Sequence, residues 1–301
     1  MATTNNDALQ RIYCMKYDFS DSLDKKVTNA VLLIRKAYRH ATWRGKRLEV
    51  AISGGKDSDV LIQLCKMGDV WGEEGLRPLH RCTTIDPPGT LKHVSDQGVE
   101  ILRPRKNFAQ CVASNGLPSM FVRHCCEELK EFGVEDYVIV GVRKCESVKR
   151  SKRYNEPTAC VTHKRGGTVE QYYPLLDWND EDIEEFIHVT GIKVHPLYYD
   201  EKGKFHVERR LGCMCCPLIY RKKRIEQFKK YPRMLRFYVR YGQKYLNEHP
   251  DVNKNIYFRD VYEEIVADLF YKDLESFQRA GLKQNEAKEY LEKYFNINLD
   301  V

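Results

Sequence analysis

The sequence lacks the features of membrane, secreted and low-complexity proteins, as expected for a globular protein of a reducing compartment. Among its 301 residues there is no run of about 18 apolar residues, so we expect no membrane-spanning helix and no membrane partner. The opening residues MATTNNDALQRIYC contain no basic segment followed by an apolar stretch, so we expect no secretory signal and a cytoplasmic location. Internal repeats and low-complexity linkers are absent as well, and no cysteine follows Cys216.

The cysteines are numerous and unevenly placed. In a reducing compartment, eleven cysteines are expected to be thiols, metal ligands or catalytic groups rather than disulfides. Five of them form two clusters, Cys125–Cys126 and Cys213/Cys215/Cys216. We expect the others to be structural: Cys14, Cys65, Cys82, Cys111, Cys145 and Cys160.

The net charge of +7 is concentrated in two segments. Residues 208–240 contain eleven Lys/Arg and two Glu, and residues 143–153 contain six Lys/Arg and one Glu. From residue 251 onward, acidic residues outnumber basic ones by eleven to seven. The two basic segments indicate a polyanion or a nucleotide as partner.

Strands and helices alternate over much of the chain. The patterns predict strands at 47–53, 79–86, 99–104, 136–143 and 169–176, and helices at 22–40, 57–67, 90–97 and 118–132. A further helix is expected between an N-cap at Asn179 and a C-cap at Gly191, and the remainder from Arg221 is expected to be helical. The alternation predicts an α/β fold with a doubly wound, mostly parallel sheet.

The loop SGGKDS (Ser53–Ser58) lies between a predicted strand and a predicted helix. It is not a Walker loop, because Val50 stands where that motif needs glycine and Asp57 stands where it needs a hydroxyl. Backbone N–H groups and the helix dipole attract an anion at such a loop, and the glycines allow close approach. We therefore expect exposed loop residues that bind phosphate; a glycine turn without a ligand is the alternative.

The loop resembles the PP-loop, S-G-G-x-D-S, of ATP pyrophosphatases and sulfonucleotide reductases. Further blocks fall in the order found in the phosphoadenosine phosphosulfate (PAPS) reductase family: TTIDPPGT (83–90), RHCCEELK (123–130), GVRKCES (141–147), YYPLLDWNDEDIEEFI (172–187) and HPLYYDEKGKFHVERRLGCMCCPL (195–218). The sequence is identified as a member of this family over residues 47–232. The resemblance implies a Rossmann-like fold of the adenine nucleotide alpha hydrolase type.

The resemblance also implies a bound adenine nucleotide, which is ATP, APS or PAPS. Its phosphates would lie on the loop residues Ser53, Gly54, Gly55, Lys56, Asp57 and Ser58, and its adenine near Thr84 and Asp86. Arg143 would face the phosphate or sulfate, and Lys56 and Asp57 would share the catalytic role with it. The expected domains are an N-terminal helical segment (1–46), a PP-loop nucleotide-binding domain (47–205), and a region with the cysteine motif and C-terminal helices (206–301).

The clustered cysteines form a CC…CxxC pattern: Cys125 and Cys126, then Cys213 and Cys216. Four thiolates suit an iron–sulfur cluster or an all-cysteine zinc site, and the absence of any metal is the third alternative. In the APS-reductase branch, which the sequence resembles here, this arrangement carries a [4Fe–4S] cluster. Cys215 could be a ligand in place of Cys213 or Cys216, or a reactive thiol beside the cluster.

The sequence departs from the reductases in one respect. They attack the sulfate sulfur with a cysteine of a C-terminal tail, and the final 85 residues here contain none. The chain is similar to Dnd-type DNA phosphorothioation enzymes and more distantly to tRNA thiolation enzymes. That resemblance implies ATP pyrophosphatase chemistry with Mg²⁺, for which Asp57 is the candidate ligand, and sulfur from a donor such as a cysteine desulfurase. A sulfonucleotide reductase and a non-catalytic nucleotide-binding module are the alternatives.

The segment 221–245 interleaves basic and aromatic residues, which is typical of nucleic-acid contact. Its basic residues are Arg221–Arg224, Lys229, Lys230, Arg233, Arg236 and Arg240, and its aromatic residues are Phe228, Tyr231, Phe237, Tyr238, Tyr241 and Tyr245. An amphipathic helix pair is the alternative, with Ile225, Phe228, Leu235, Tyr238 and Tyr245 packed inward.

Overall fold

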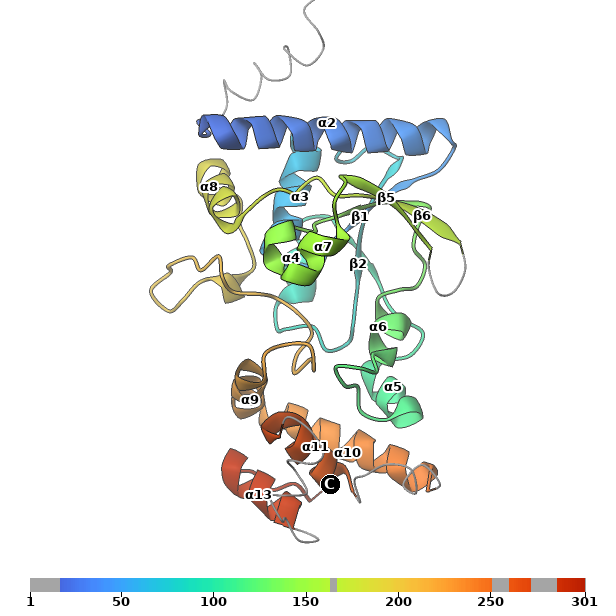
Figure 1. Ribbon diagram of the computed structural model, residues 1–301, viewed down its shortest axis with the longest axis vertical. Helices are drawn as coiled ribbons and strands as arrows, with labels where there is room; N and C mark the ends of the chain where they lie inside the picture. Colours follow the sequence, from blue (N-terminus) through green and yellow to red (C-terminus); the bar gives the residue numbers. More distant parts are fainter. Residues whose placement is uncertain (1–16, 163–166, 251–259, 272–285, 301) are drawn as a thin grey trace, which may run out of the picture. The chain divides into compact units, whose positions relative to one another are not determined.

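The computed structural model describes residues 17–162, 167–250, 260–271 and 286–300 (Figure 1). The chain forms two compact units, each assembled from separate stretches of sequence. The first contains residues 1–81, 87–102 and 133–212, and the second contains residues 82–86, 103–132 and 213–301. Residues 82–86 and 103–132, which lie within the predicted nucleotide-binding domain, therefore belong to the second unit. Cys14 lies outside the described residues.

The first unit is built on a six-stranded sheet of order β3-β2-β1-β4-β6-β5. Its strands are β1 (Leu48–Ala51), β2 (Leu76–Arg81), β3 (Glu100–Leu102), β4 (Tyr137–Val140), β5 (Thr158–Thr162) and β6 (Thr168–Tyr172). Every neighbouring pair is parallel except β5 and β6, which are antiparallel. The predicted α/β class with a mostly parallel sheet is confirmed.

The strand order has one reversal that matters for binding. From β1 the chain continues through β2 and β3 toward one edge of the sheet, and β4 then pairs with the other side of β1. Ligands of open α/β sheets bind beyond the carboxyl ends of the strands at such a point. The segments that follow β1 and β4 are therefore the expected walls of a site.

Helices flank this sheet (Figure 1). They are α2 (Asp21–Trp43), α3 (Lys56–Met67), α4 (Thr90–Ser95), α7 (Val148–Arg153) and α8 (Asp180–Thr190), with short 3₁₀ turns at Lys144–Glu146 and Pro196–Tyr198. The long α2 contacts β1, β4, β6 and α3. Its apolar residues recur at helical spacing and therefore form one buried face. These residues are Leu23, Val27, Ala30, Val31, Ile34, Ala37 and Ala41. The caps predicted for α8 are confirmed, since Asn179 accepts the N–H of Asp182 and Gly191 ends the helix in the left-handed conformation.

The second unit is helical in its described residues. It contains α5 (Phe108–Asn115), α6 (His124–Leu129), α9 (Arg221–Lys230), α10 (Pro232–Glu248), α11 (Val261–Phe270) and α13 (Glu286–Phe295). Helix α10 packs on α5, α9 and α11 around a core that includes Phe108, Phe228 and Tyr238. The predicted C-terminal helices are confirmed within the described residues. No helix there is both long and apolar enough to cross a bilayer.

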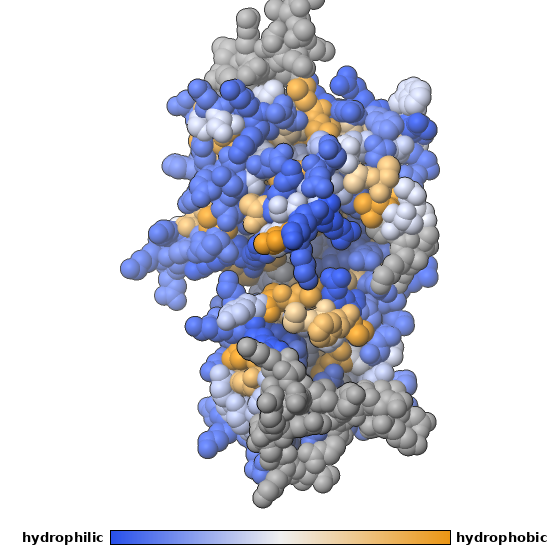
Figure 2. All heavy atoms as spheres, in the orientation of Figure 1, coloured by the Kyte–Doolittle hydropathy of each residue, from blue (hydrophilic) through white to orange (hydrophobic). Residues whose placement is uncertain are grey.

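Some predicted elements differ in extent. Strand β2 begins at Leu76, ahead of Pro78, which cannot donate to a ladder, and it ends at Arg81. Only 124–129 of the predicted helix 118–132 is α-helical. Helix α5 was not predicted although Asn107 and Gln110 form a capping box, and the short edge strand β5, with the sequence TACVT, was not predicted either. The visible face is mostly hydrophilic with small hydrophobic patches (Figure 2).

A buried ion pair links two neighbouring strands. Glu49 in β1 is fully buried, and its carboxylate accepts hydrogen bonds from both terminal nitrogens of Arg81 at 2.5 and 2.8 Å. An exposed pair of the same chemistry joins Arg77 and Glu100 at 2.8 and 2.6 Å. Glu49→Gln should lower the free energy of unfolding by about 3 kcal/mol, because it removes the negative charge that both terminal nitrogens of Arg81 contact in the buried pair. The measurement is urea unfolding followed by circular dichroism.

The matched control is Glu100→Gln. This variant should lose less than about 1 kcal/mol of unfolding free energy, because the Glu100 carboxylate is hydrated. Equal losses in the two variants would contradict the importance of the buried pair.

Candidate functional site

The SGGKDS loop joins β1 to α3 and is closely packed. Gly55 is the N-cap of α3, and Gly54 has a φ of +79°, in the left-handed region. A Cβ at Gly54 would lie 2.9 Å from Cγ2 of Thr90 and 3.2 Å from Cγ1 of Val94, so only glycine fits there. The predicted strand–loop–helix context of the phosphate site is present.

The polar side chains of the loop shape its backbone. The Ser58 hydroxyl donates to the carbonyl oxygen of Gly55 at 2.7 Å, and Oγ of Ser53 accepts the N–H of Gly55 at 3.3 Å. Ser58 is buried, so the expectation of an exposed side chain is wrong for this residue, and Lys56 is buried as well. The buried Ser58 side chain therefore stabilises the turn of the loop through its hydrogen bond to Gly55.

Tyr198 is a loop partner that the sequence analysis did not name. Its hydroxyl accepts the backbone N–H groups of Lys56 and, at 3.3 Å, of Leu211. The Lys56 ammonium lies 5.5 Å from the centroid of the Tyr198 ring. Burial raises the pKa of Tyr198 to about 12, so the phenol is neutral at pH 7. The HPLYY block that contains this tyrosine was the available signal.

Arg143 follows β4 and reaches the start of α3. Its side chain is 2% exposed. Nε lies 2.7 Å from Oδ1 of Asp57, and a terminal nitrogen donates to Oδ1 of Asp180 at 2.7 Å. Burial lowers the pKa of Arg143, but the two carboxylates outweigh burial and raise it above its usual range. The predicted residues Asp57 and Arg143 are thus in direct contact.

The contact between Asp57 and Arg143 is an ion pair without a hydrogen bond. The N–H direction does not meet the geometry of a hydrogen bond, and within the described part of the chain neither Oδ1 of Asp57 nor Nε of Arg143 has another hydrogen-bond partner. Buried polar atoms are otherwise almost always satisfied. The pair therefore places one carboxylate oxygen and one guanidinium N–H, neither of them hydrogen-bonded to a described residue, at the start of α3.

Further cations lie around the same carboxylate. Arg150 contacts the Glu146 carboxylate, and Arg210 donates to the backbone oxygen of Glu146 at 2.9 Å. Burial and the neighbouring Arg210 lower the pKa of Arg150, while Asp57 acts to raise it. With Lys56 and Arg143, these side chains form a basic cluster that suits a polyphosphate.

A buried polar network supports the loop from the other side. Asp59 in α3 accepts hydrogen bonds from His93 at 2.9 Å and Gln97 at 3.0 Å. Burial lowers the pKa of His195 to about 4, so its ring is neutral at pH 7. Because Nδ1 of His195 accepts a backbone N–H, Nε2 carries the proton and donates to the Thr90 hydroxyl at 3.3 Å. Thr90 is the residue whose methyl group faces the loop glycine.

The predicted adenine residues belong to the second unit. The Asp86 carboxylate accepts the N–H of Thr83 at 2.8 Å and its hydroxyl at 2.7 Å. Thr84 has a φ of +62°, which is unusual for a β-branched residue, and its Oγ1 accepts the N–H of Phe108 at 2.8 Å. The carbonyl oxygen of Ile85 accepts the N–H of Met214, in the cysteine motif. The adenine role of Thr84 and Asp86 stays a prediction.

The second unit also gathers the four predicted cysteine ligands. Cys125 and Cys126 are hydrogen-bonded to each other, and both Cys213 and Cys216 act electrostatically on Cys125. The hydrogen bond from Cys125, aided by Lys130 and opposed by burial, lowers the pKa of Cys126 to about 6. The Lys130 ammonium is hydrogen-bonded to Cys213. Two segments far apart in sequence thus bring four half-buried thiols together.

The donors fit a thiolate-ligated metal in kind and number. In the described ranges, however, no three His, Cys, Asp or Glu side chains are placed as a group that could hold a metal ion. The metal role of the four cysteines stays a prediction.

The extra thiol of the motif is buried. Cys215 is 0% exposed and belongs to the hydrophobic core, and burial raises its pKa to about 12. Burial without solvent access disfavours a reactive thiol, and the alternative that Cys215 is a ligand in place of Cys213 or Cys216 stays a prediction. Of the six cysteines expected to be structural, Cys65, Cys82 and Cys111 are buried, whereas Cys145 and Cys160 are exposed.

The basic helices α9 and α10 differ in part from the expected nucleic-acid surface. Arg224 is buried, donates to the carbonyl oxygen of Cys215 at 2.8 Å, and pairs with Asp268, so it cannot contact a phosphate. Phe228 and Tyr238 are core residues, as the amphipathic alternative predicted. Of the basic residues expected to contact phosphate, the exposed ones are Lys222, Lys223, Lys229, Lys230, Arg233, Arg236 and Arg240.

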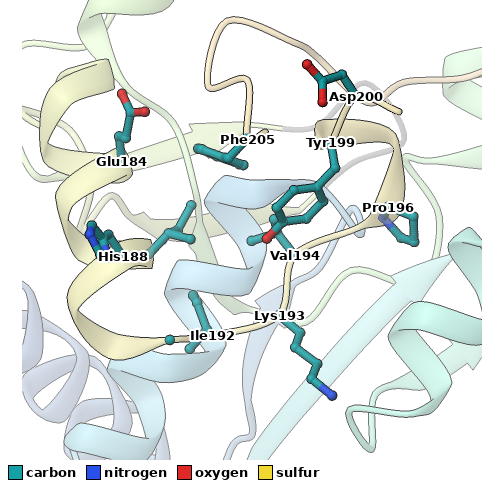
Figure 3. A pocket seen from close by; sticks show the side chains of 11 residues that line it. Glu184, His188, Ile192, Lys193, Val194, Pro196, Tyr199, Asp200 and Phe205 are labelled. Atoms are coloured by element: carbon teal, nitrogen blue, oxygen red, sulfur yellow. The ribbon is translucent and has the colours of Figure 1, made fainter. Parts of the chain in front are cut away.

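A separate cavity of about 810 Å³ lies near the C-terminal end of α8 (Figure 3). Tyr199 and Phe205 line it together with Glu184 and Asp200, whereas the Lys193 side chain points away from these residues. No residue of the SGGKDS loop lines it, and its two carboxylates would repel phosphate. The basic cluster at the loop is therefore the better phosphate site.

The sequence profile of the phosphoadenosine phosphosulfate reductase domain matches residues 47–219. An uncharacterised protein of Methanocaldococcus jannaschii is 26% identical over 235 residues, which cover 73% of this chain and 53% of that protein. The chain spans about half the length of the curated relatives that it matches.

Three solved structures are similar at low identity. The Candida glabrata FMN adenylyltransferase has a TM-score of 0.44 at 15% identity, with coverage of 64% of this chain and 65% of that one. The Candida auris PAPS reductase has a TM-score of 0.40 at 14% identity, covering 71% and 96%. The U34-tRNA thiolase of Methanococcus maripaludis, with its [4Fe–4S] cluster, has a TM-score of 0.36 at 12% identity, covering 75% and 80%.

A substitution at Gly54 tests the loop. Gly54→Ala should weaken ATP binding at least about tenfold, a loss of about 1.4 kcal/mol, because the added Cβ would displace the loop from Thr90. Isothermal titration calorimetry measures the affinity. Gly98→Ala is the control: Gly98 has a similar φ of +76° but no atom within 4 Å of its added Cβ. If both variants bind ATP like the parent, the loop is not the phosphate site.

Proposed function

The chain belongs to the phosphoadenosine phosphosulfate reductase domain family, and on this premise we propose that it is an ATP pyrophosphatase that activates nucleic acid for sulfur transfer. The observation that carries the proposal is the Asp57–Arg143 pair at the start of α3. It places a carboxylate oxygen and a guanidinium N–H, neither of them hydrogen-bonded within the described ranges, beside Lys56. A polyphosphate and its counter-ion require that combination of groups.

In the proposed reaction, an oxygen of the acceptor attacks the α-phosphorus of ATP. The bond from that phosphorus to the β-phosphate oxygen breaks, and pyrophosphate leaves. Lys56, Arg143 and the loop N–H groups stabilise the negative charge that grows on the leaving group. Sulfide then replaces AMP, which departs with the acceptor's oxygen, so that no electrons are gained or lost.

Asp57 is the residue that would hold Mg²⁺, because its Oδ1 accepts no hydrogen bond from the described residues and a carboxylate oxygen is the ligand this ion prefers. Cys125, Cys126, Cys213 and Cys216 would hold an iron–sulfur cluster, with zinc as the alternative. When bound, such a cluster would carry the sulfur to be transferred. Cys126 supports this role, since its low pKa favours the thiolate form that metals bind. A cysteine desulfurase is a suitable sulfur donor when two thiols reduce its persulfide, which releases the outer sulfur as sulfide and leaves a disulfide.

Pyrophosphate release tests the reaction. The parent protein should release pyrophosphate from ATP when nucleic acid is present. Arg143→Lys should reduce the rate by about 100-fold or more, because a lysine cannot bridge two carboxylates and still stabilise the leaving group. A coupled pyrophosphate assay measures the rate. Lys144→Ala is the control, since this neighbouring cation pairs with Asp177 at the surface.

Thioredoxin-dependent release of sulfite from APS or PAPS at an enzymatic rate would overturn the proposal and assign the chain to the reductases. Nucleotide binding without turnover of any of these substrates would favour the non-catalytic module.

Absorbance spectroscopy tests the cluster. Protein purified without oxygen should be brown, with broad absorbance near about 400 nm from thiolate-ligated iron. Cys126→Ser should remove most of this absorbance because serine is a poor ligand for cluster iron. Cys160→Ser should keep it, because this exposed cysteine lies in β5 of the other unit. A colourless protein with one zinc per chain would replace the cluster with a zinc site.

A further inference from the structure

Exposed hydrophobic side chains gather beside the cysteines. Among the described residues, ten large hydrophobic side chains are exposed, and five of them belong to the segments that carry the two cysteine clusters: Met120, Phe121, Val122, Leu218 and Tyr220. We call these five residues the apolar rim. Single exposed hydrophobic residues are ordinary, but their concentration on both segments of one site indicates an interaction surface.

The first part of the rim is held exposed by its own turn. Oγ of Ser119 accepts the N–H groups of Phe121 at 3.2 Å and Val122 at 3.1 Å, and the Ser119 N–H donates to the carbonyl oxygen of Val122 at 2.9 Å. Phe121 is 93% exposed at the tip of this turn. Because the backbone is already ordered, binding a partner there costs less conformational entropy.

The second part of the rim follows the CxxC segment. The Ile219 N–H donates to the carbonyl oxygen of Cys216 at 3.2 Å, and the Arg224 N–H donates to that of Tyr220 at 3.1 Å. Tyr220 is therefore fixed between a turn at Cys216 and the start of α9, and its side chain is 75% exposed. Both aromatic side chains lie four residues from a cysteine of the cluster.

Basic side chains adjoin both parts of the rim. Arg123 follows Val122 directly, and Lys222 and Lys223 lie in the first turn of α9, which begins directly after Tyr220; all three are exposed. Exposed aromatic groups beside exposed cations are the combination that binds single-stranded nucleic acid, by stacking on bases and by contact with phosphates. A paired base in a duplex does not offer its face to such groups.

We propose that the apolar rim binds unpaired nucleic acid at the cysteine site, with Phe121 and Tyr220 stacking on bases and Arg123, Lys222 and Lys223 contacting phosphates. The proposal rests on the proposed function and specifies its substrate as a single strand or an extruded base. It also assigns the stacking role to residues outside α9 and α10, whose aromatic side chains Phe228 and Tyr238 are buried.

Fluorescence anisotropy with the full chain, purified without oxygen, tests the proposal in the absence of ATP. The probe is a fluorescein-labelled single-stranded oligonucleotide of about 20 nucleotides, longer than typical site sizes, and its duplex is the competitor. The parent should prefer the single strand. Phe121→Ala and Tyr220→Ala should each weaken binding at least about fivefold, the effect of losing one stacked base. Tyr220→Phe should retain the affinity, because stacking needs only the ring.

Two further variants separate stacking from charge. Trp43→Ala is the control, since Trp43 is also exposed beside an arginine but lies in α2 of the other unit, and its loss should leave the affinity unchanged. The pair Lys222→Ala/Lys223→Ala should reduce the dependence of log affinity on log salt by about 1 per lost phosphate contact, whereas Phe121→Ala should leave that slope unchanged.

Equal affinity for duplex and single strand, or unchanged affinity in both alanine variants of the rim, would overturn the proposal. If those variants bind the oligonucleotide normally but accept less sulfur from a cysteine desulfurase, the rim is a protein-docking surface instead. Failure of the proposed reaction would appear separately, as loss of pyrophosphate release with oligonucleotide binding intact.

Discussion

The buried guanidinium of Arg143 joins the elements that make the nucleotide site. It projects from the segment after β4, pairs with Asp57 at the start of α3, and donates to Asp180 at the start of α8. A buried arginine without charge partners would be strongly unfavourable, so these carboxylates are necessary to the fold as well as to the site. Because β4 and β1 are neighbours at the reversal of strand order, this cation lies beside the SGGKDS loop.

The loop itself is held in place before any ligand arrives. Tyr198 bonds its backbone from one side, and the network of Asp59, His93 and His195 supports it from the other. Electrostatic stabilisation of a leaving group is most effective when the donors need no reorganisation. The burial of Lys56 and Ser58 serves the same purpose, because buried side chains are held by packing and keep a fixed orientation.

The second unit joins three segments that are distant in sequence. The turn that contains Ile85 is bonded to Met214 in the CxxC segment, and Cys125 interacts with thiols of that segment. Arg224 bonds the carbonyl oxygen of Cys215 from the core. The cysteine motif is therefore anchored to the helical core of the unit, while the aromatic side chains next to it are exposed.

The features that the sequence determined by itself depend on residues that are close together in the chain. The apolar spacing of α2, the caps of α8 and the glycine loop are local patterns, and local patterns depend on neighbours that the sequence places together. Tertiary structure alone decided which charged and aromatic residues are available for binding. In sequence, Arg224 and Lys222 are alike, as are Tyr238 and Tyr220. Their different burial depends on contacts with distant residues such as Asp268 and Phe108, which no local pattern specifies.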